Sequence, residues 1–387
     1  MQYDFTTLTD RRNTNSMKWS GPESIIPAWV ADMDFPTAPV ITQAVVEKAQ
    51  KGIFGYACVP DRMWTLVADW WKRRYGWAID PKWMHFTTGV MPSIHSIVKS
   101  LTAPGDKVVV LSPVYHCFFH AIEWNGRFVK EAPIPFENNR YRFDPAALEE
   151  ALSDPAVTLF LLCNPHNPTG QLWTKEELAE MGRLAAKHQV PVVSDEIHCD
   201  LTDPGTTYVP FASVNEECAQ NAVVTVSPSK TFNIPGINAS FTVIPNENLR
   251  RRVETGLARD QVGFPNALSV EAVVAAYGEG EAWVDELRQV LADNKARVCE
   301  VIGKELPELK VTHMAATYLV WIDCSAVTKD ADRLVEHLRD VAGVQLSPGS
   351  QFRGNGQARI RLNPATQPAR LEEILKRFVA GVRSYRE

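Results

Sequence analysis

The sequence lacks long hydrophobic runs, repeats and low-complexity tracts. Its longest apolar runs, near residues 158–163 and 272–277, fall far short of the ~20 residues that a membrane-spanning helix needs. It also lacks an excess of basic charge, because 40 Lys and Arg stand against 46 Asp and Glu, a net charge of −6. Without a positive field, we expect neither a nucleic acid nor a membrane as a partner.

Cysteine is sparse and unpatterned. The seven cysteines are scattered, their number is odd, and no C-x-x-C occurs. The first residues lack a charged stretch followed by an apolar one, so the sequence predicts a cytoplasmic location. Three Cys–His neighbours lack the spacing of a structural zinc site, and we expect no metal. They are Cys163 with His166, His116 with Cys117, and His198 with Cys199.

What the chain does have is the composition of a folded protein. At roughly 100–200 residues per domain, 387 residues predict two or three domains, and 45% hydrophobic residues are typical of a globular core. Five short apolar runs predict strands buried on both faces, as in a parallel sheet flanked by helices. These runs are 108–111, 157–163, 190–193, 222–226 and 240–244. Between them, Thr174 and Glu177 form a capping-box pattern that predicts a helix start.

The pattern changes near residue 281. A helical stretch over 281–302 precedes short strand-like runs at 309–311, 318–322 and 359–362, with further helices near 331–341 and from 368. This mixture predicts a smaller α+β domain. We therefore predict a large domain over 46–280, a small domain over 281–387, and an N-terminal segment, 1–45, that packs with the small domain.

Three polar residues follow the ends of predicted central strands: Asn167, Asp195 and Lys230. Singly, each has an ordinary interpretation, as a turn, a helix cap and a surface lysine. In an open α/β sheet, however, ligands bind outside the carboxyl ends of the strands, where all three would converge. A desolvated lysine is a nucleophilic amine, and a lysine combined with a carboxylate is typical of pyridoxal phosphate (PLP) chemistry.

Four motifs in this order resemble those of the fold-type I PLP enzymes, which have the aspartate aminotransferase fold: Asn-Pro-Thr-Gly at 167–170, Asp-Glu-Ile-His at 195–198, Ser-Pro-Ser-Lys at 227–230 and Arg-Leu-Asn at 361–363. The resemblance spans nearly the whole chain. Within this fold, the stretches 29–35, 54–56, 227–233 and 361–363 resemble the MalY/PatB-type cystathionine β-lyases, or C–S lyases, of the aminotransferase class I/II superfamily. The fold so implied is α/β, a large domain with a mostly parallel central sheet plus a smaller α+β domain.

The resemblance also implies roles for individual residues. PLP would be bound as an aldimine on Lys230, with Asp195 on the pyridine nitrogen and Tyr115 stacked on the ring; Lys230 and Tyr115 would be catalytic. Asn167, and His198 nearby, would lie at the phenolic oxygen. The cofactor phosphate would lie on the backbone of Gly89, Val90 and Met91, at a predicted helix start whose free N–H groups attract anions, with Ser227 and Ser229 beside it. Tyr56 would reach the phosphate of the neighbouring subunit, which implies a homodimer with shared active sites.

The substrate carboxylate needs an arginine. A guanidinium binds a carboxylate through two parallel hydrogen bonds and keeps its charge. Arg361 and Arg359 would lie on one face of a strand, and only the Arg-Leu-Asn match favours Arg361. The resemblance adds Ala31 and Asn167 as substrate contacts. After Asn363 the sequence departs from the family pattern, which affects packing near this site more than the choice of arginine.

The expected reaction is α,β-elimination of cystathionine or another cysteine S-conjugate to a thiol, pyruvate and ammonia. An aminotransferase is the alternative, because the same Lys, Asp and Arg serve both reactions. The Ser227-x-x-Lys230 pattern also fits serine acylases, but their S-D-N and K-T-G companions are replaced by Ser-Asp-Glu and Lys-Thr-Phe. A binding or regulatory role would be a second role only, since no additional DNA-binding segment is present.

Overall fold

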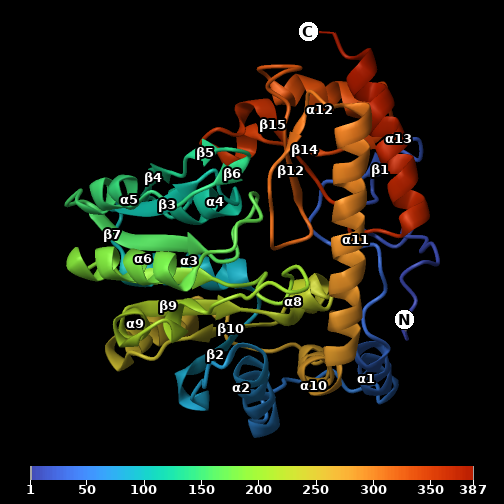
Figure 1. Ribbon diagram of the computed structural model, residues 1–387. Helices are drawn as coiled ribbons and strands as arrows, with labels where there is room; N and C mark the ends of the chain where they lie inside the picture. Colours follow the sequence, from blue (N-terminus) through green and yellow to red (C-terminus); the bar gives the residue numbers. More distant parts are fainter. Residues whose placement is uncertain (1, 387) are drawn as a thin grey trace.

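The computed structural model describes residues 2–386. Its large part is built on a seven-stranded sheet in the order β2-β10-β9-β8-β7-β3-β4 (Figure 1). The strands are β2 (Met84–Thr87), β3 (Lys107–Ser112), β4 (Phe128–Pro133), β7 (Val157–Cys163), β8 (Val192–Asp195), β9 (Ala222–Val226) and β10 (Ser240–Val243). β9, β8, β7, β3 and β4 run parallel, which confirms the predicted α/β fold with a mostly parallel sheet.

Apolar clusters cover both faces of this sheet. In β3, Val109 and Leu111 belong to one cluster, whereas Val108 and Val110 belong to the other, because successive side chains point to opposite faces. This double burial explains the continuous apolar runs. It does not fix strand direction: β10 has the same pattern and is antiparallel to β9 and β2. The sheet is therefore mostly parallel, as predicted, and β10 is its antiparallel strand.

Helices pack around the sheet. They are α1 (Pro39–Gln50), α2 (Asp61–Tyr75), α3 (Val90–Leu101), α4 (Cys117–Glu123), α5 (Pro145–Leu152), α6 (Lys175–Lys187), α7 (Glu216–Gln220), α8 (Pro228–Thr231), α9 (Glu247–Arg259) and α10 (Ser269–Glu279). α6 begins with the predicted capping box: Thr174 accepts from the Glu177 N–H while the Glu177 side chain accepts from the Thr174 N–H. α1 and α2 pack on α10 at the bottom of the view in Figure 1.

The second part has its own sheet and core. Its sheet is antiparallel, in the order β11 (Lys310–Val311), β12 (Val320–Asp323), β15 (Arg359–Leu362) and β14 (Ser347–Pro348). α12 (Ala331–Asp340) and α13 (Pro368–Ser384) cover it and share one apolar cluster with it. The strands β1 (Ile26–Pro27) and β13 (Val344–Gln345) pair in parallel, and β5 (Phe136–Glu137) pairs with β6 (Arg140–Tyr141). The predicted small α+β region is present.

The long helix α11 (Glu281–Glu305) connects the two parts and is drawn in orange in Figure 1. Its Trp283 and Leu287 lie in the core beside the large sheet, whereas Val298 and Ile302 lie in the small core. The predicted domain boundaries remain predictions; residue 45 falls within α1, and residue 281 begins α11. Within residues 2–386, no helix combines the length and the apolarity needed to cross a membrane.

Candidate active site

Three neighbouring parallel strands end at one edge of the large sheet. The register places Cys163 of β7 beside Asp195 of β8, and Asp195 beside Thr225 of β9. The chain just after these strands and the start of α3 enclose a cavity of about 230 Å³. Most of the predicted site residues line it: Ala31, Gly89, Val90, Met91, Tyr115, Asn167, Asp195, His198, Ser229 and Lys230.

The start of α3 forms one wall of the cavity. Gly89 has φ +152°, and a Cβ there would lie 3.3 Å from Pro92 Cδ, so a glycine suits this turn. The N–H groups of the first helical turn have no intrahelical partners, and the helix dipole adds positive potential. This end of α3 can therefore hold a phosphate group.

Ser227 lies behind the cavity wall. Its Oγ accepts from the Ser229 N–H at 3.0 Å and donates to Ala239 O at 2.7 Å, so that it caps the short helix α8. Ser229 itself lines the cavity. Ser227 thus shapes the turn that carries Lys230, while Ser229 is the serine of the pair that faces the cavity.

Asp195 is a buried acid without a basic partner among residues 2–386. Its carboxylate accepts from the Ile197 N–H at 3.1 Å, and burial raises its pKa to about 7. The adjacent Glu196 lies in the core, where Ser194, Phe211 and other groups donate to it. Asp195 is therefore the acid that can meet a protonated ring nitrogen.

Lys230 lies opposite. Burial lowers the pKa of its amine to about 8; nearby Asp32 opposes this shift and Arg361 adds to it. Its Nζ donates to the Ala31 carbonyl. An amine with such a pKa is neutral often enough near neutral pH to act as a nucleophile or a base.

Arg361 is buried, with only 4% of its surface exposed, and has no carboxylate partner among residues 2–386. Its Nη1 donates to Asn167 Oδ1 at 3.0 Å and its Nη2 to Trp29 O at 3.1 Å, while its Nε has no partner within the described chain. Burial lowers its pKa to about 10. A buried cation held only by neutral groups is suited to an anionic ligand.

Strand register separates the two arginines of β15. Asp323 of β12 lies opposite Arg359, and the two side chains form an ion pair at 3.1 Å. Trp321 lies opposite Arg361 and supplies no charge. The positive charge of Arg359 is thus already compensated, whereas that of Arg361 is not.

His198 and Asn167 each have a side-chain nitrogen without a hydrogen-bond partner in residues 2–386. His198 Nδ1 is buried without a hydrogen bond, and burial, helped by Lys230 and Arg361, lowers the pKa of this imidazole to about 3. Asn167 accepts from Arg361 through Oδ1, and no bond from its Nδ2 is found within residues 2–386. Burial raises the pKa of Tyr115 above its usual range, so its hydroxyl stays neutral.

These residues fit PLP. The helix start can take the phosphate, Asp195 can take the ring nitrogen, and Asn167 and His198 present unpaired nitrogens in the same cavity. Arg361 lies beside this set and is joined to it through Asn167.

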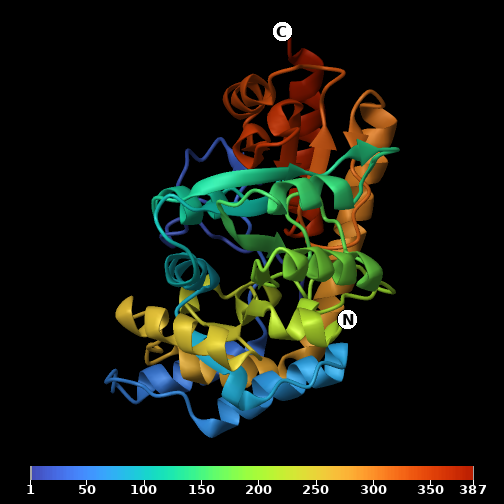
Figure 2. The same ribbon diagram turned by 90° about the vertical axis from the view of Figure 1, so that its left-hand side faces the viewer.

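Tyr56 lies apart from the cavity. It is fully exposed on the loop between α1 and α2, and with Phe54 and Pro265 it lines a separate hollow. Figure 2 shows this loop, in blue, projecting from the body at the lower left. Within one chain, Tyr56 does not reach the other predicted site residues.

Some residues of the site were not given roles by the sequence. Tyr318 Oη donates to the Ala31 carbonyl at 2.8 Å, and Asn233 and Asn363 bind the backbone of residues 30–35. Asn233 and Asn363 lie in the motifs that carry the family resemblance, which is a signal that they matter. Tyr318 lies two residues before β12 and has no local signal, because its partner is 287 residues away.

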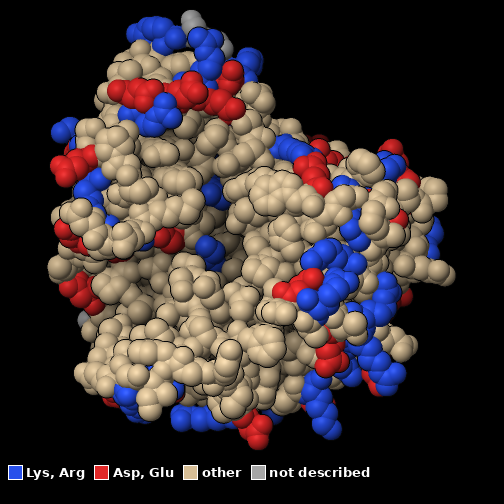
Figure 3. All heavy atoms as spheres, turned by 180° about the vertical axis from the view of Figure 1, so that it is seen from behind, with Lys and Arg blue, Asp and Glu red and all other residues tan. Residues whose placement is uncertain are grey.

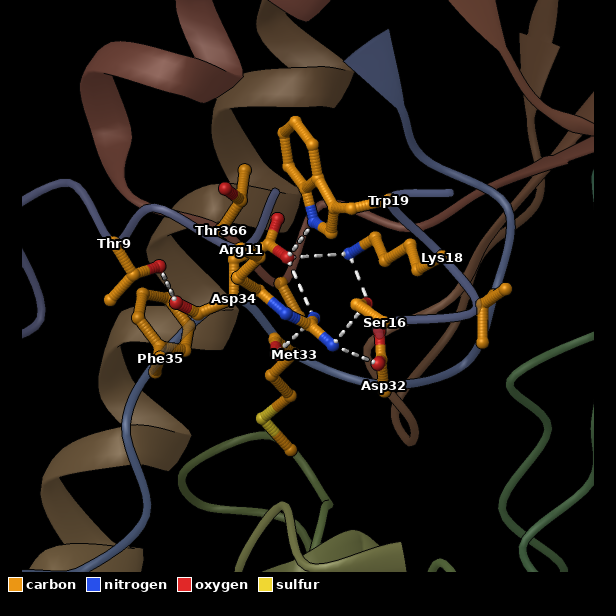
Figure 4. A network of polar contacts seen from close by, with 12 residues as sticks. Thr9, Arg11, Ser16, Lys18, Trp19, Asp32, Met33, Asp34, Phe35 and Thr366 are labelled. Carbon is orange, nitrogen blue, oxygen red and sulfur yellow. Dashed lines mark hydrogen bonds and ion pairs between the residues drawn. The ribbon is translucent and has the colours of Figure 1, made fainter. Parts of the chain in front are cut away.

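A polar network supports the same N-terminal segment (Figure 4). Asp34 Oδ1 accepts from Arg11 at 2.9 Å, Lys18 at 3.1 Å and Trp19 at 2.9 Å. Arg11 also reaches Asp32 at 2.7 Å. Asp34, which is buried, and Asp32, which is partly buried, are therefore both ion-paired with basic residues of the N-terminal segment.

Comparison with known proteins agrees with this geometry. Residues 30–378 match the family Aminotransferase class I and II. The chain is 38% identical to cystathionine beta-lyase PatB of Bacillus subtilis over 98% of this chain and 100% of that protein. The PLP-containing cystalysin of Treponema denticola matches with a TM-score of 0.95 and 32% identity, covering 99% of both chains. The PLP-bound C–S lyase of Staphylococcus hominis gives a TM-score of 0.93 and 32% identity over 99% and 98% of the two chains. The chain belongs to the aminotransferase class I and II family, among its PLP-dependent C–S lyases.

Proposed function

We propose that this protein is a PLP-dependent carbon–sulfur β-lyase that eliminates a thiol from L-cystathionine or another cysteine S-conjugate and yields pyruvate and ammonia. The observation that carries the proposal is a set of three ionisable groups, none of which forms an ion pair within residues 2–386: Lys230 and Asp195 line one cavity, and the buried Arg361 lies beside it, bonded to Asn167. Full-length similarity to PatB supports the choice of reaction.

In the proposed mechanism, Arg361 binds the substrate α-carboxylate, and Lys230 would hold the cofactor before the substrate binds. Bound PLP supplies a carbonyl carbon that bonds to amines and a ring that accepts the electron pair of the broken Cα–H bond. Asp195 keeps the ring nitrogen protonated. Asn167 and His198 occupy the side of the phenolic oxygen.

Lys230, as a free amine, takes the Cα proton. The electron pair released at Cα then expels the sulfur substituent as a thiolate when the Cβ–S bond breaks, and the remaining three-carbon amine hydrolyses to pyruvate and ammonia. Lys230 near pKa 8 is suited to removing this proton, because both of its protonation states are accessible near neutral pH. Tyr115, kept neutral by burial, would supply an aromatic face for the ring.

We further propose a homodimer in which Tyr56 completes the site of the partner subunit. Ile53, Phe54, Tyr56 and Phe264 are large and exposed, which favours a covered surface over a solvated one. In Figure 3, the lower part of the rear face has few charged side chains, and most of the charges lie around its rim. Sedimentation equilibrium of the purified protein should give twice the chain mass.

The test of function is direct. PLP-loaded protein is mixed with L-cystathionine in the absence of any keto acid, and pyruvate and free thiol are measured. Equal amounts of both products are expected. Amination of an added keto acid without release of pyruvate would instead identify an aminotransferase. Failure of the protein to take up PLP as a visible chromophore would overturn the proposal altogether.

A further inference from the structure

Residues 29–35 form a segment, here called the strap, that runs past the cavity and is held at every residue. Each of its seven backbone carbonyls accepts a hydrogen bond from a side chain elsewhere in the chain. The donors are Arg361 and Ser347 to Trp29, Asn363 to Val30 and Asp32, Lys230 and Tyr318 to Ala31, Arg11 and Asn233 to Met33, Thr9 and Gln367 to Asp34, and Asn233 to Phe35.

The Asn363 side chain binds the centre of the strap at the two residues that flank Ala31. Asn363 is 1% exposed, and its Nδ2 donates to Val30 O at 2.6 Å and to Asp32 O at 2.7 Å. Its Oδ1 accepts from the Ala365 N–H at 2.8 Å, which fixes the amide orientation. Both N–H bonds of the amide are thus committed to the two carbonyls that flank Ala31.

These two hydrogen bonds of Asn363 determine how the backbone of Ala31 is oriented. Its carbonyl does not go to Asn363 but accepts from Lys230 Nζ and Tyr318 Oη. Because a trans peptide is planar, binding the Val30 carbonyl also aims the Ala31 N–H away from Asn363, and that N–H has no partner within residues 2–386. Ala31 lines the cavity.

We propose that Asn363 is a positioning residue: by binding the Val30 and Asp32 carbonyls, it orients the Ala31 carbonyl that holds the free amine of Lys230, and Tyr318 shares that carbonyl. The inference rests on the proposed function, because Lys230 is the base there. A neutral amine that donates one N–H to Ala31 keeps its lone pair available for the Cα proton. Without this acceptor, the long lysine side chain would sample other rotamers.

The experiment measures the titration of Lys230 itself. The full-length protein, freed of cofactor, is labelled with trace acetic anhydride across pH 6–11, and acetylation of the Lys230 peptide is quantified by mass spectrometry. Asp32, Arg361, Asp195 and the Cys117 thiol also act on this amine and stay unchanged in the variants. Asn363→Ala should lower the labelling pKa by about one unit, because the charged amine loses its hydrogen-bond acceptor.

The matched control is Asn294→Ala. Asn294 is buried, and its Nδ2 likewise bridges two carbonyls, those of Pro364 and Thr366, both at 2.8 Å, in the chain that follows Asn363; within residues 2–386 it has no bond to the strap or to Lys230. This variant should melt earlier but leave the Lys230 titration and kcat unchanged. In the PLP-loaded protein, Asn363→Ala should lower kcat more than it raises KM, because it displaces the base rather than the carboxylate site.

Tyr318→Phe provides a second, isosteric test. Removing its hydroxyl leaves the Ala31 carbonyl to Lys230 alone, so the labelling pKa should rise by about half a unit, opposite in sign to Asn363→Ala. If neither variant shifts the titration, or if Asn294→Ala shifts it equally, Asn363 has only a structural role. Absence of PLP uptake by the parent protein would count against the proposed function, while the labelling result would still stand.

Discussion

Two groups of charged residues contact the strap, and only one of them forms ion pairs within residues 2–386. On the N-terminal side, Asp34 is bound by Arg11 and Lys18. Although burial opposes it, Lys18, Trp19 and Arg11 hold the pKa of Asp34 below its usual range. On the cavity side, Lys230 and Arg361 have no ion-pair partner in residues 2–386. Burial lowers the pKa of both groups, which favours their neutral forms.

The ion-paired charges stabilise the fold, whereas the unpaired charges are available to bind a ligand. A paired buried charge is costly to break, because removal of one partner leaves the other uncompensated. An unpaired buried charge is costly to keep, and it persists where a ligand of opposite charge or a reaction requires it. Four predictions test this comparison.

The largest effect is expected for Lys230→Ala. Loss of the amine removes both the attachment point of the cofactor and the base, so pyruvate release should fall by at least ~10³-fold. Circular dichroism should show that the variant is folded. Turnover at the parent rate would contradict the assignment of Lys230.

The next effect is on stability. Asp34→Ala should cost about 3–5 kcal/mol of unfolding free energy, because Arg11 and Lys18 lose a buried partner. Arg361→Leu in the same urea titration of cofactor-free protein should be neutral or stabilising, because it removes an unpaired buried charge. Equal destabilisation by both changes would erase the distinction between the two groups.

The two arginines of β15 should differ in catalysis. Arg361→Leu should lower kcat/KM by about 10²-fold, since it removes charged hydrogen bonds to the substrate carboxylate worth roughly 2–3 kcal/mol. Arg359→Leu should leave kcat/KM near the parent value but weaken the fold, because Asp323 loses its partner. Both variants are compared by steady-state kinetics with a cysteine S-conjugate. A larger loss of kcat/KM in Arg359→Leu than in Arg361→Leu would contradict the assignment of the substrate carboxylate to Arg361.

The smallest effect concerns pH. Burial raises the pKa of Asp195 to about 7, so between about pH 4 and pH 7 the folded chain binds more protons at this site than the unfolded chain. The contribution of Asp195 to stability is therefore present at low pH and is lost as the pH rises through 7. In cofactor-free Asp195→Asn, the melting temperature should fall less between pH 5 and pH 7 than it does in the parent. Parallel curves would show that Asp195 does not titrate there.

The sequence by itself determined the α/β fold and most of the cavity. Buried strands appear in the sequence as apolar runs. Polar residues at or soon after their carboxyl ends converge, because parallel strands end at one edge of the sheet. Local patterns of this kind also predicted the capping box of α6 and the helix start at Gly89. These features depend on neighbours a few residues apart.

Only the tertiary structure decided which charges are paired. Arg359 and Arg361 have the same chemistry in sequence, and the register of β12 against β15 gives an acid to one and a tryptophan to the other. Likewise, Asn363 and Tyr318 meet the strap across 333 and 287 residues, contacts for which no local pattern exists. Chain folding brings such groups together after long loops are closed, and the resulting contacts, rather than the residue types, distinguish the site from the scaffold.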